Sequence, residues 1–131
     1  MDNLYFPPRE LAVMSILWKR GSATVTEVRE ALGEELAYTS VLSVLQILKE
    51  KDFVRHESEG RAYRYYPRVG ADRAGGSALA RIRNAIFHGS SERMFAHIVA
   101  DQKLSRSELQ RMQTLLAERL GSDVPDDGGT P

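Results

Sequence analysis

Residues 38–54, YTSVLSVLQILKEKDFV, decide the fold of this chain. Four aliphatic residues follow the spacing i, i+3, i+4, i+7, which is typical of a helix with one face in a core. This core-facing set comprises Val41, Val44, Leu45 and Leu48. The rest of the helix carries short hydroxyls, one amide and two aliphatic side chains: Thr39, Ser40, Leu42, Ser43, Gln46 and Ile47. Such groups suit the major groove of DNA, where hydroxyls and amides bind base edges and aliphatic groups contact thymine methyls. The competing interpretation is that Leu42 and Ile47 pack on a neighbouring element.

Two helices are expected before this one. Residues 9–19 carry a stripe of Leu11, Met14, Leu17 and Trp18, with prolines at 7 and 8 before it and Gly21 after it, which suits a helix start and stop. In the next segment, SATVTEVREALG, Thr24 and Glu27 have the spacing of a capping box. Its short helix has a stripe of Val25, Val28 and Leu32, and we expect Gly33 to end it. Near Thr24 and Thr26, backbone N–H groups at this helix start can bind phosphate.

A β-hairpin is expected after the quoted stretch. The helix should stop near Lys51–Asp52 with a left-handed residue, a conformation that Asp tolerates better than most residues. Two β-prone runs, residues 53–57 and 62–66, then flank a Ser-Glu-Gly turn. Arg61 lies at the tip and Arg64 further along the second strand, where both can reach a sugar-phosphate backbone. Three helices followed by a hairpin predict a mainly α fold with a small β-hairpin wing, a winged helix-turn-helix domain.

The C-terminal part reads as three further helices with apolar stripes. Ser105 and Glu108 form a capping box, Leu104 and Leu109 a hydrophobic staple, and Gly121 a stop. Three short helices bury little surface by themselves. We therefore expect these helices to pack against a second chain in a homodimer. The residues assigned to dimerisation are Leu79, Ile82, Ile86, Met94, Phe95, Ile98, Val99, Leu109, Met112 and Leu116. The predicted organisation is a DNA-binding domain over 1–70, a helical dimerisation domain over 71–121 and a disordered tail over 122–131.

Composition narrows the function classes. The chain has 18 basic and 18 acidic residues, but residues 61–91 hold six arginines and one acid, a basic region suited to nucleic acid. There is no cysteine, no apolar run long enough to span a membrane and no export signal, so we expect a cytoplasmic protein without membrane insertion. His56, His88 and His97 show no metal-ligand spacing, and no catalytic or phosphate-loop motif is present. We therefore expect no enzyme activity, no metal and no cofactor.

Four segments together resemble the penicillinase-repressor family (BlaI/MecI), which also includes the CopY copper repressors. They are Trp18 at the end of the first helix, YTSVLSVLQILKEK (38–51), EGRAYRYYP (59–67) and LSRSELQRMQTLL (104–116). The resemblance implies a dimeric transcriptional repressor that binds an inverted-repeat promoter operator in double-stranded DNA. Its recognition-helix contacts fall on the outward residues named above, and its wing-tip contact falls on Gly60–Arg61. This chain has Ile47 where many members carry Arg, and Asp52 where many carry Gly.

The family's two signalling branches give different expectations. The copper branch uses a cysteine-rich C-terminal site, which this chain lacks. The antibiotic-responsive branch is inactivated by proteolysis, with a membrane sensor protease as the inducer. Alignment on Leu104–Ser105 puts that scissile bond at His97–Ile98, although Ile98 as a plain core residue of the dimer is an equal alternative.

Two alternative functions stay open. A winged-helix module for protein contacts would bury the 38–50 helix in a partner. A ligand-responsive regulator would bind a small apolar molecule between the winged domain and the C-terminal helices. Loss of binding with salt favours DNA over the first alternative, and a ligand-induced rise in melting temperature would support the second.

Overall fold

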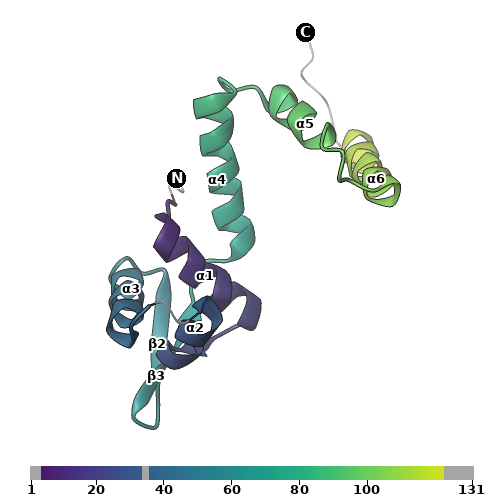
Figure 1. The fold of residues 1–131 in the computed structure, drawn as a ribbon. Helices are drawn as coiled ribbons and strands as arrows, with labels where there is room; N and C mark the ends of the chain where they lie inside the picture. Colours follow the sequence, from purple (N-terminus) through teal and green to yellow (C-terminus); the bar gives the residue numbers. More distant parts are fainter. Residues whose placement is uncertain (1–3, 34–35, 123–131) are drawn as a thin grey trace. The chain divides into compact units, whose positions relative to one another are not determined.

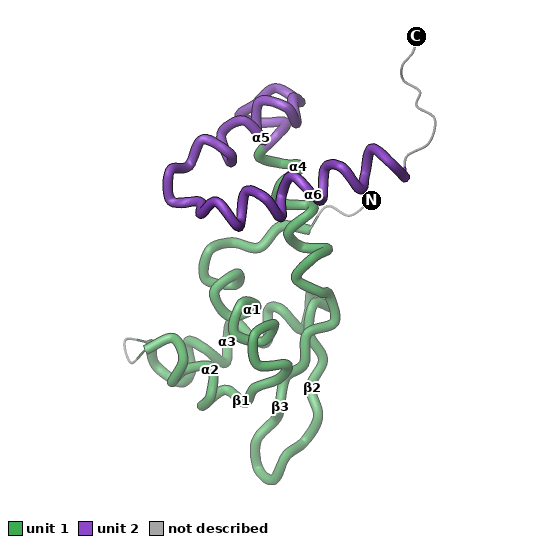
Figure 2. The backbone as a smooth tube through the Cα atoms, turned by 90° about the vertical axis from the view of Figure 1, so that its right-hand side faces the viewer, with its two compact units in different colours: residues 1–82 green, residues 83–131 purple. Residues whose placement is uncertain are grey.

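The computed structural model describes residues 4–33 and 36–122, which form two compact units divided between Ile82 and Arg83 (Figure 2). The elements in chain order are α1 (Pro8–Arg20), β1 (Ala23–Thr24), α2 (Val25–Leu32), α3 (Tyr38–Glu50), β2 (Val54–Glu59), β3 (Ala62–Pro67), α4 (Ala71–Ile86), α5 (Ser91–Val99) and α6 (Arg106–Ser122) (Figure 1). The mainly α winged helix-turn-helix fold is confirmed. The predicted disordered tail lies outside the described residues except for Ser122.

Helix α3 is the centre of the first core. Its buried residues are Val41, Val44, Leu45 and Leu48, so the predicted core-facing set is confirmed. The helix stops as predicted at Asp52, which adopts a left-handed φ of 70°. The N–H of Asp52 donates to Lys49 O (2.9 Å) and that of Phe53 to Leu48 O (2.9 Å). These two bonds form a Schellman motif, which turns the chain directly into the wing.

Helix α1 packs on α3 through a buried face that differs in part from the predicted stripe. Val13, Met14 and Leu17 are buried, but Leu11 is 45% exposed. The buried face instead runs through Glu10, whose carboxylate accepts a hydrogen bond from Lys51 Nζ at 2.9 Å. An ion pair with the residue that caps the end of α3 therefore allows an acid to occupy a position that apolar periodicity alone does not assign to the core.

The wing belongs to a three-stranded antiparallel sheet of order β1–β3–β2. Residues 23–24 pair with residues 64–65, and this short strand was not predicted from the sequence. The hairpin strands are also longer than predicted, because Glu59 pairs with Ala62 and leaves only Gly60 and Arg61 in the loop. Gly60 has a φ of 63°, which a two-residue hairpin loop favours.

An N-terminal arm, residues 4–7, ties α4 to the first unit. Phe6 is buried, with its ring 6.0 Å from that of Trp18 and 4.8 Å from that of Phe53. The carbonyl of Leu4 accepts hydrogen bonds from Ser77 Oγ and Arg81 Nη1. The first compact unit therefore runs to Ile82, past residue 70, and the domain boundary at 70 stays a prediction.

The second unit, residues 83–122, contains the end of α4 together with α5 and α6. Ser90 and Ser105 cap the starts of α5 and α6, accepting hydrogen bonds from the N–H groups of Arg93 and Glu108 at 3.0 Å each. The predicted stop at Gly121 is wrong, because α6 continues to Ser122. No residue among 83–122 is buried. Among the described residues, no helix is both long and apolar enough to cross a membrane.

Candidate nucleic-acid interface

The outward face of α3 presents the predicted contact residues on one side of the helix. Thr39, Ser43, Gln46 and Ile47 are exposed, and Ser40 and Leu42 are half-buried. At about 100° per residue, these six occupy one arc and the four buried aliphatic residues another. Leu42 packs partly against the core, as the competing interpretation expected, whereas Ile47 is 41% exposed.

A hollow of about 540 Å³ lies between α3 and the hairpin. It brings together Leu42, Gln46 and Arg61, three of the predicted contacts, from two elements. Its walls also include residues that the sequence analysis did not assign to the site: Tyr38, Lys49, Glu50, His56 and Tyr63. Tyr38 and Lys49 lie four positions before and seven after Leu42, so helical periodicity could have found them.

Aromatic rings from the wing line this hollow. The ring of His56 lies 4.0 Å from that of Tyr63, tilted by 31°, and 5.5 Å from that of Tyr65. Tyr65 is buried, and burial raises the pKa of its phenol. His56 Nδ1 is buried and has no hydrogen-bond partner among the described residues. On the other side of the hairpin the Arg55 guanidinium lies 4.2 Å from the ring centre of Tyr66.

The two predicted wing arginines have different surroundings. Arg61 is exposed at the loop. The guanidinium of Arg64 lies 3.1 Å from Glu27 Oε1 and 2.7 Å from Glu59 Oε1, and it also donates to Ser22 Oγ at 3.2 Å. Hydrogen bonds from Arg64 lower the pKa of both Glu27 and Glu59, and the two carboxylates raise the pKa of Arg64. Contact between Arg64 and DNA stays a prediction, and its guanidinium has carboxylate partners already.

The start of α2 forms the predicted capping box. Thr24 Oγ1 accepts from the N–H of Glu27 at 3.2 Å, and the N–H of Thr24 donates to Glu27 Oε1 at 3.1 Å. The polar groups of Thr24 therefore have partners within the helix start. Thr26, in the first turn, is exposed.

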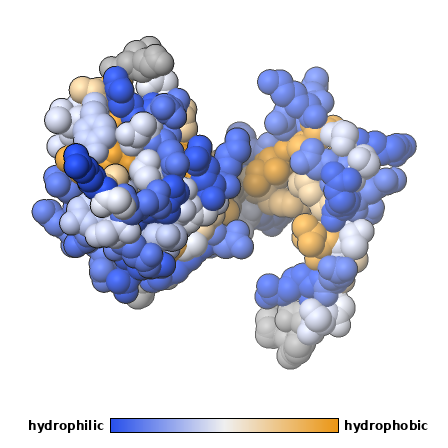
Figure 3. Space-filling model, turned by 90° about the horizontal axis from the view of Figure 1, so that it is seen from below, coloured by the Kyte–Doolittle hydropathy of each residue, from blue (hydrophilic) through white to orange (hydrophobic). Residues whose placement is uncertain are grey.

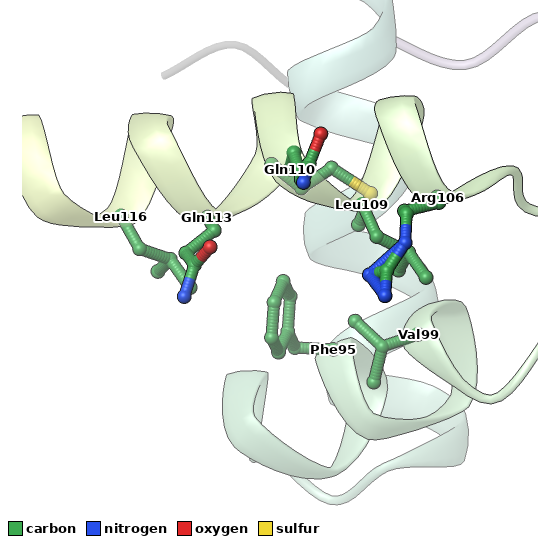
Figure 4. Close-up of a pocket in the computed structure, with 8 residues that line it drawn as sticks. Phe95, Val99, Arg106, Leu109, Gln110, Gln113 and Leu116 are labelled. Atoms are coloured by element: carbon green, nitrogen blue, oxygen red, sulfur yellow. The ribbon is translucent and has the colours of Figure 1, made fainter.

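Apolar side chains are exposed on the C-terminal helices, where Figure 3 shows hydrophobic surface. Members of the predicted dimerisation set with large exposure are Leu79, Ile82, Ile86, Phe95, Ile98, Val99, Leu109 and Leu116; Met94 and Met112 are half-buried. Between α5 and α6 a pocket of about 590 Å³ is lined by Phe95 and Val99 on one side and Leu109 and Leu116 on the other (Figure 4). Polar side chains, Arg106, Gln110 and Gln113, also line this pocket.

The predicted proteolysis site lies in α5. His97 and Ile98 are both exposed, and the His97 ring lies 5.1 Å from that of Phe87. Within the described residues no group of three His, Asp or Glu side chains could hold a metal ion.

A helix-turn-helix followed by a hairpin wing defines the class: winged-helix DNA-binding regulators. The penicillinase repressor family model matches residues 7–118, and the chain belongs to this family. Transcriptional regulator BlaI of Mycobacterium tuberculosis is 36% identical over 113 residues, which cover 83% of this chain and 80% of that protein. The penicillinase repressor of Bacillus licheniformis is 24% identical over 111 residues, covering 83% and 87%.

Two solved structures are similar to this chain. The solution structure of the DNA-binding domain of the repressor BlaI covers 55% of this chain and 90% of that one, at 26% identity and a TM-score of 0.49. The complex structure of hsRosR-S4 covers 92% and 94%, at 14% identity and a TM-score of 0.51; it supports the fold alone. The family match and the BlaI relative identify the chain as a transcriptional repressor of the BlaI type.

Proposed function

We propose that this repressor acts as a homodimer that binds an inverted-repeat promoter operator. Helix α3 lies in the major groove and the wing contacts the backbone. One observation carries the proposal: the outward arc of α3 offers hydroxyl, amide and aliphatic groups with no acid between Tyr38 and Lys49. That is the chemistry that base edges and thymine methyls require.

Backbone contacts complete the proposed binding mode. Arg61, exposed at the loop, is the proposed phosphate contact of the wing. Thr26 and the first turn of α2 offer a second contact. Phosphate contacts fix the register of the protein on the duplex, and α3 reads the sequence. The bound protein then blocks RNA polymerase at an overlapping promoter.

The dimer rests on the apolar surface of the C-terminal helices. Nothing among residues 83–122 is buried in one chain, and the α5–α6 pocket is open to a partner. Two linked winged domains bind half-sites about 34–36 Å apart, or near that spacing. The second half-site then binds at high effective concentration, so the dimer gains affinity without new contacts.

In vitro selection tests this proposal. Purified protein is mixed with sheared genomic DNA at moderate salt, and the retained fragments are sequenced. We expect an enriched inverted repeat next to promoters. Folded protein that enriches no sequence would overturn operator recognition and favour the protein-contact module, to which half-buried Leu42 and exposed Ile47 are also suited.

We also propose cleavage at His97–Ile98, by a membrane sensor protease, as the inducing step. Both residues are exposed in a single chain but lie inside α5, and Ile98 belongs to the proposed dimer surface, so the protease needs the two chains to separate and this helix to unfold locally. Intact-mass measurement on protein from antibiotic-treated cells should then show a fragment ending at His97. Derepression with only full-length protein present would exclude proteolysis as the signal.

A further inference from the structure

A second cavity lies in the first unit, away from the proposed DNA contacts. It has a volume of about 260 Å³ and lies among the N-terminal arm, α1 and the first turns of α4. The residues that matter for its chemistry are Phe6, Trp18, Ala74, Gly75, Ala78 and Arg81. The proposed operator contacts on α3 and the wing are not among its lining residues.

Small residues on α4 keep this cavity open. Ala74, Gly75 and Ala78 follow the spacing i, i+1, i+4 on the side of α4 that lines it. A Cβ built on Gly75 meets no atom within 4 Å. Gly75 is therefore at the open side of the cavity, whereas the adjacent Ala74 is buried.

The size and walls of the cavity suit one aromatic ring. A cavity of about 150 Å³ lined by apolar side chains holds a benzene molecule, so about 260 Å³ leaves room for a ring with one small substituent. Phe6 and Trp18 meet edge to face, at 89° and 6.0 Å. The indole N–H already donates to Val69 O at 2.8 Å, so Trp18 offers the cavity apolar surface.

Arg81 gives the cavity a cationic group. Its Nη1 donates to the carbonyl of Leu4 and to Ser77 Oγ, and its guanidinium lies 5.2 Å from the ring centre of Tyr5. No acid forms a salt bridge with Arg81 among the described residues. A guanidinium held in place by neutral acceptors is a good partner for a carboxylate.

We infer that this cavity binds a small monocyclic aromatic carboxylic acid, with its ring against Phe6 and Trp18 and its carboxylate on Arg81. The acid would compete for the Arg81 N–H groups that now hold the N-terminal arm to α4. If the protein represses as proposed above, the site would make its activity responsive to a small molecule.

The single tryptophan of the chain makes the test direct, because Trp18 lines the cavity. Benzoate is titrated into the full-length protein in the millimolar range, and tryptophan fluorescence and Tm are recorded. We expect a saturable fluorescence change and a rise in Tm. Benzyl alcohol, which has the ring without the charge, should bind at least tenfold more weakly. Equal binding of both compounds would overturn the carboxylate assignment.

Two adjacent glycines supply matched variants. Both glycines are exposed and a Cβ at either meets nothing within 4 Å, but Gly75 lines the cavity and Gly76 does not, so Gly75→Leu places its side chain at the cavity and Gly76→Leu is the matched control. Benzoate binding should be lost in the first variant and retained in the second. Arg81→Gln keeps a donor for Leu4 O and should weaken benzoate binding at least tenfold. Absence of saturation in the wild type, or unchanged binding in a folded Gly75→Leu variant, would overturn the inference, whether or not operator DNA binds.

Discussion

The guanidinium of Arg64 lies 3.1 Å from the carboxylate of Glu27, a residue 37 positions earlier in the chain. The same guanidinium pairs with Glu59 on the opposite strand of the hairpin. One side chain therefore joins the base of the wing to the first turn of α2. This pairing fixes the hairpin relative to the helix-turn-helix, and so positions the loop that carries Arg61.

Arg61 and Arg64 should respond differently to the same substitution. Arg64→Gln removes the link to two carboxylates, so we expect Tm to fall by a few degrees and the hairpin amides to lose hydrogen-exchange protection. Arg61→Gln should leave Tm unchanged and weaken binding to all DNA sequences equally, lowering the slope of log affinity against log salt by about one. Unchanged salt dependence in Arg61→Gln would remove this residue from the phosphate contacts.

The Arg64 ion pairs also predict acid sensitivity. Arg64 lowers the pKa of Glu27 and Glu59 in the folded protein. A lowered folded pKa means that the stabilisation is fully present above the unfolded carboxyl pKa, about 4.3, and is lost as pH falls through the folded values. Denaturant unfolding measured from pH 7 downward should therefore show stability falling below about pH 5.

Glu27→Gln isolates this effect, because Gln can still accept the backbone hydrogen bond of the capping box. The variant should have a lower free energy of unfolding than the wild type at neutral pH. This gap, the difference between the two free energies of unfolding, should narrow in acid. Glu30→Gln, an exposed change on the same helix, is the control and should leave the gap near zero. A Glu27→Gln gap that stays constant with pH would contradict the linkage.

Charge on the outward face of α3 should abolish operator binding. Ser43 is exposed on the proposed groove face, so Ser43→Glu places an anion against phosphates and base edges. We expect specific binding to be lost in electrophoretic or anisotropy assays with little change in Tm. Ser15→Glu, the same substitution at an exposed position of α1, should bind as the wild type does. Wild-type affinity in Ser43→Glu would mean that this face does not bind DNA.

The two arcs of α3 predict opposite mutational effects. Leu45 is fully buried, so Leu45→Ala should lower the free energy of unfolding by about 2–5 kcal/mol. Ile47→Ala on the exposed arc should change it by no more than about 0.5 kcal/mol but alter sequence preference. Chemical denaturation and binding to operator variants measure the two effects. A large stability loss in Ile47→Ala would mean that this residue packs within the protein instead of facing DNA.

Dimerisation should depend on the exposed leucines of α6. Leu116→Glu puts a charge in the α5–α6 pocket and should shift the protein to monomers in analytical ultracentrifugation. Affinity for a two-site operator should fall by about 10²–10⁴-fold. Arg111→Glu is the control, since it lies about 140° around the helix from Leu116. A Leu116→Glu variant that stays dimeric would place the interface elsewhere.

Local patterns explain which parts of the fold could be predicted. The buried face of α3, its left-handed stop at Asp52 and the capping box of α2 depend on residues within one or two turns of each other. Apolar periodicity and capping chemistry encode such features directly. The hairpin is likewise predicted by two β-prone runs on either side of a short turn. The order of helices and hairpin then indicates the winged fold.

Contacts between distant segments explain the rest. Strand β1 forms because residues 23–24 pair with a strand 40 residues later, and two residues carry no β pattern of their own. Leu11 is exposed because Glu10, paired with Lys51, occupies the buried side of α1 instead. The role of Arg64 likewise depends on Glu27, which lies far away in sequence. At the site, Tyr38 and Lys49 were missed although they share a helix face with Leu42.

Nothing among residues 83–122 is buried within a single chain, so in the proposed dimer the C-terminal helices gain most of their protection from the second chain. If they do associate there, dilution lowers the melting temperature and exposes the helices to cellular proteases. Abundant repressor would then be long-lived and scarce repressor short-lived. A cell that stops making the protein would clear the remainder at an accelerating rate, and the genes it controls would switch on abruptly.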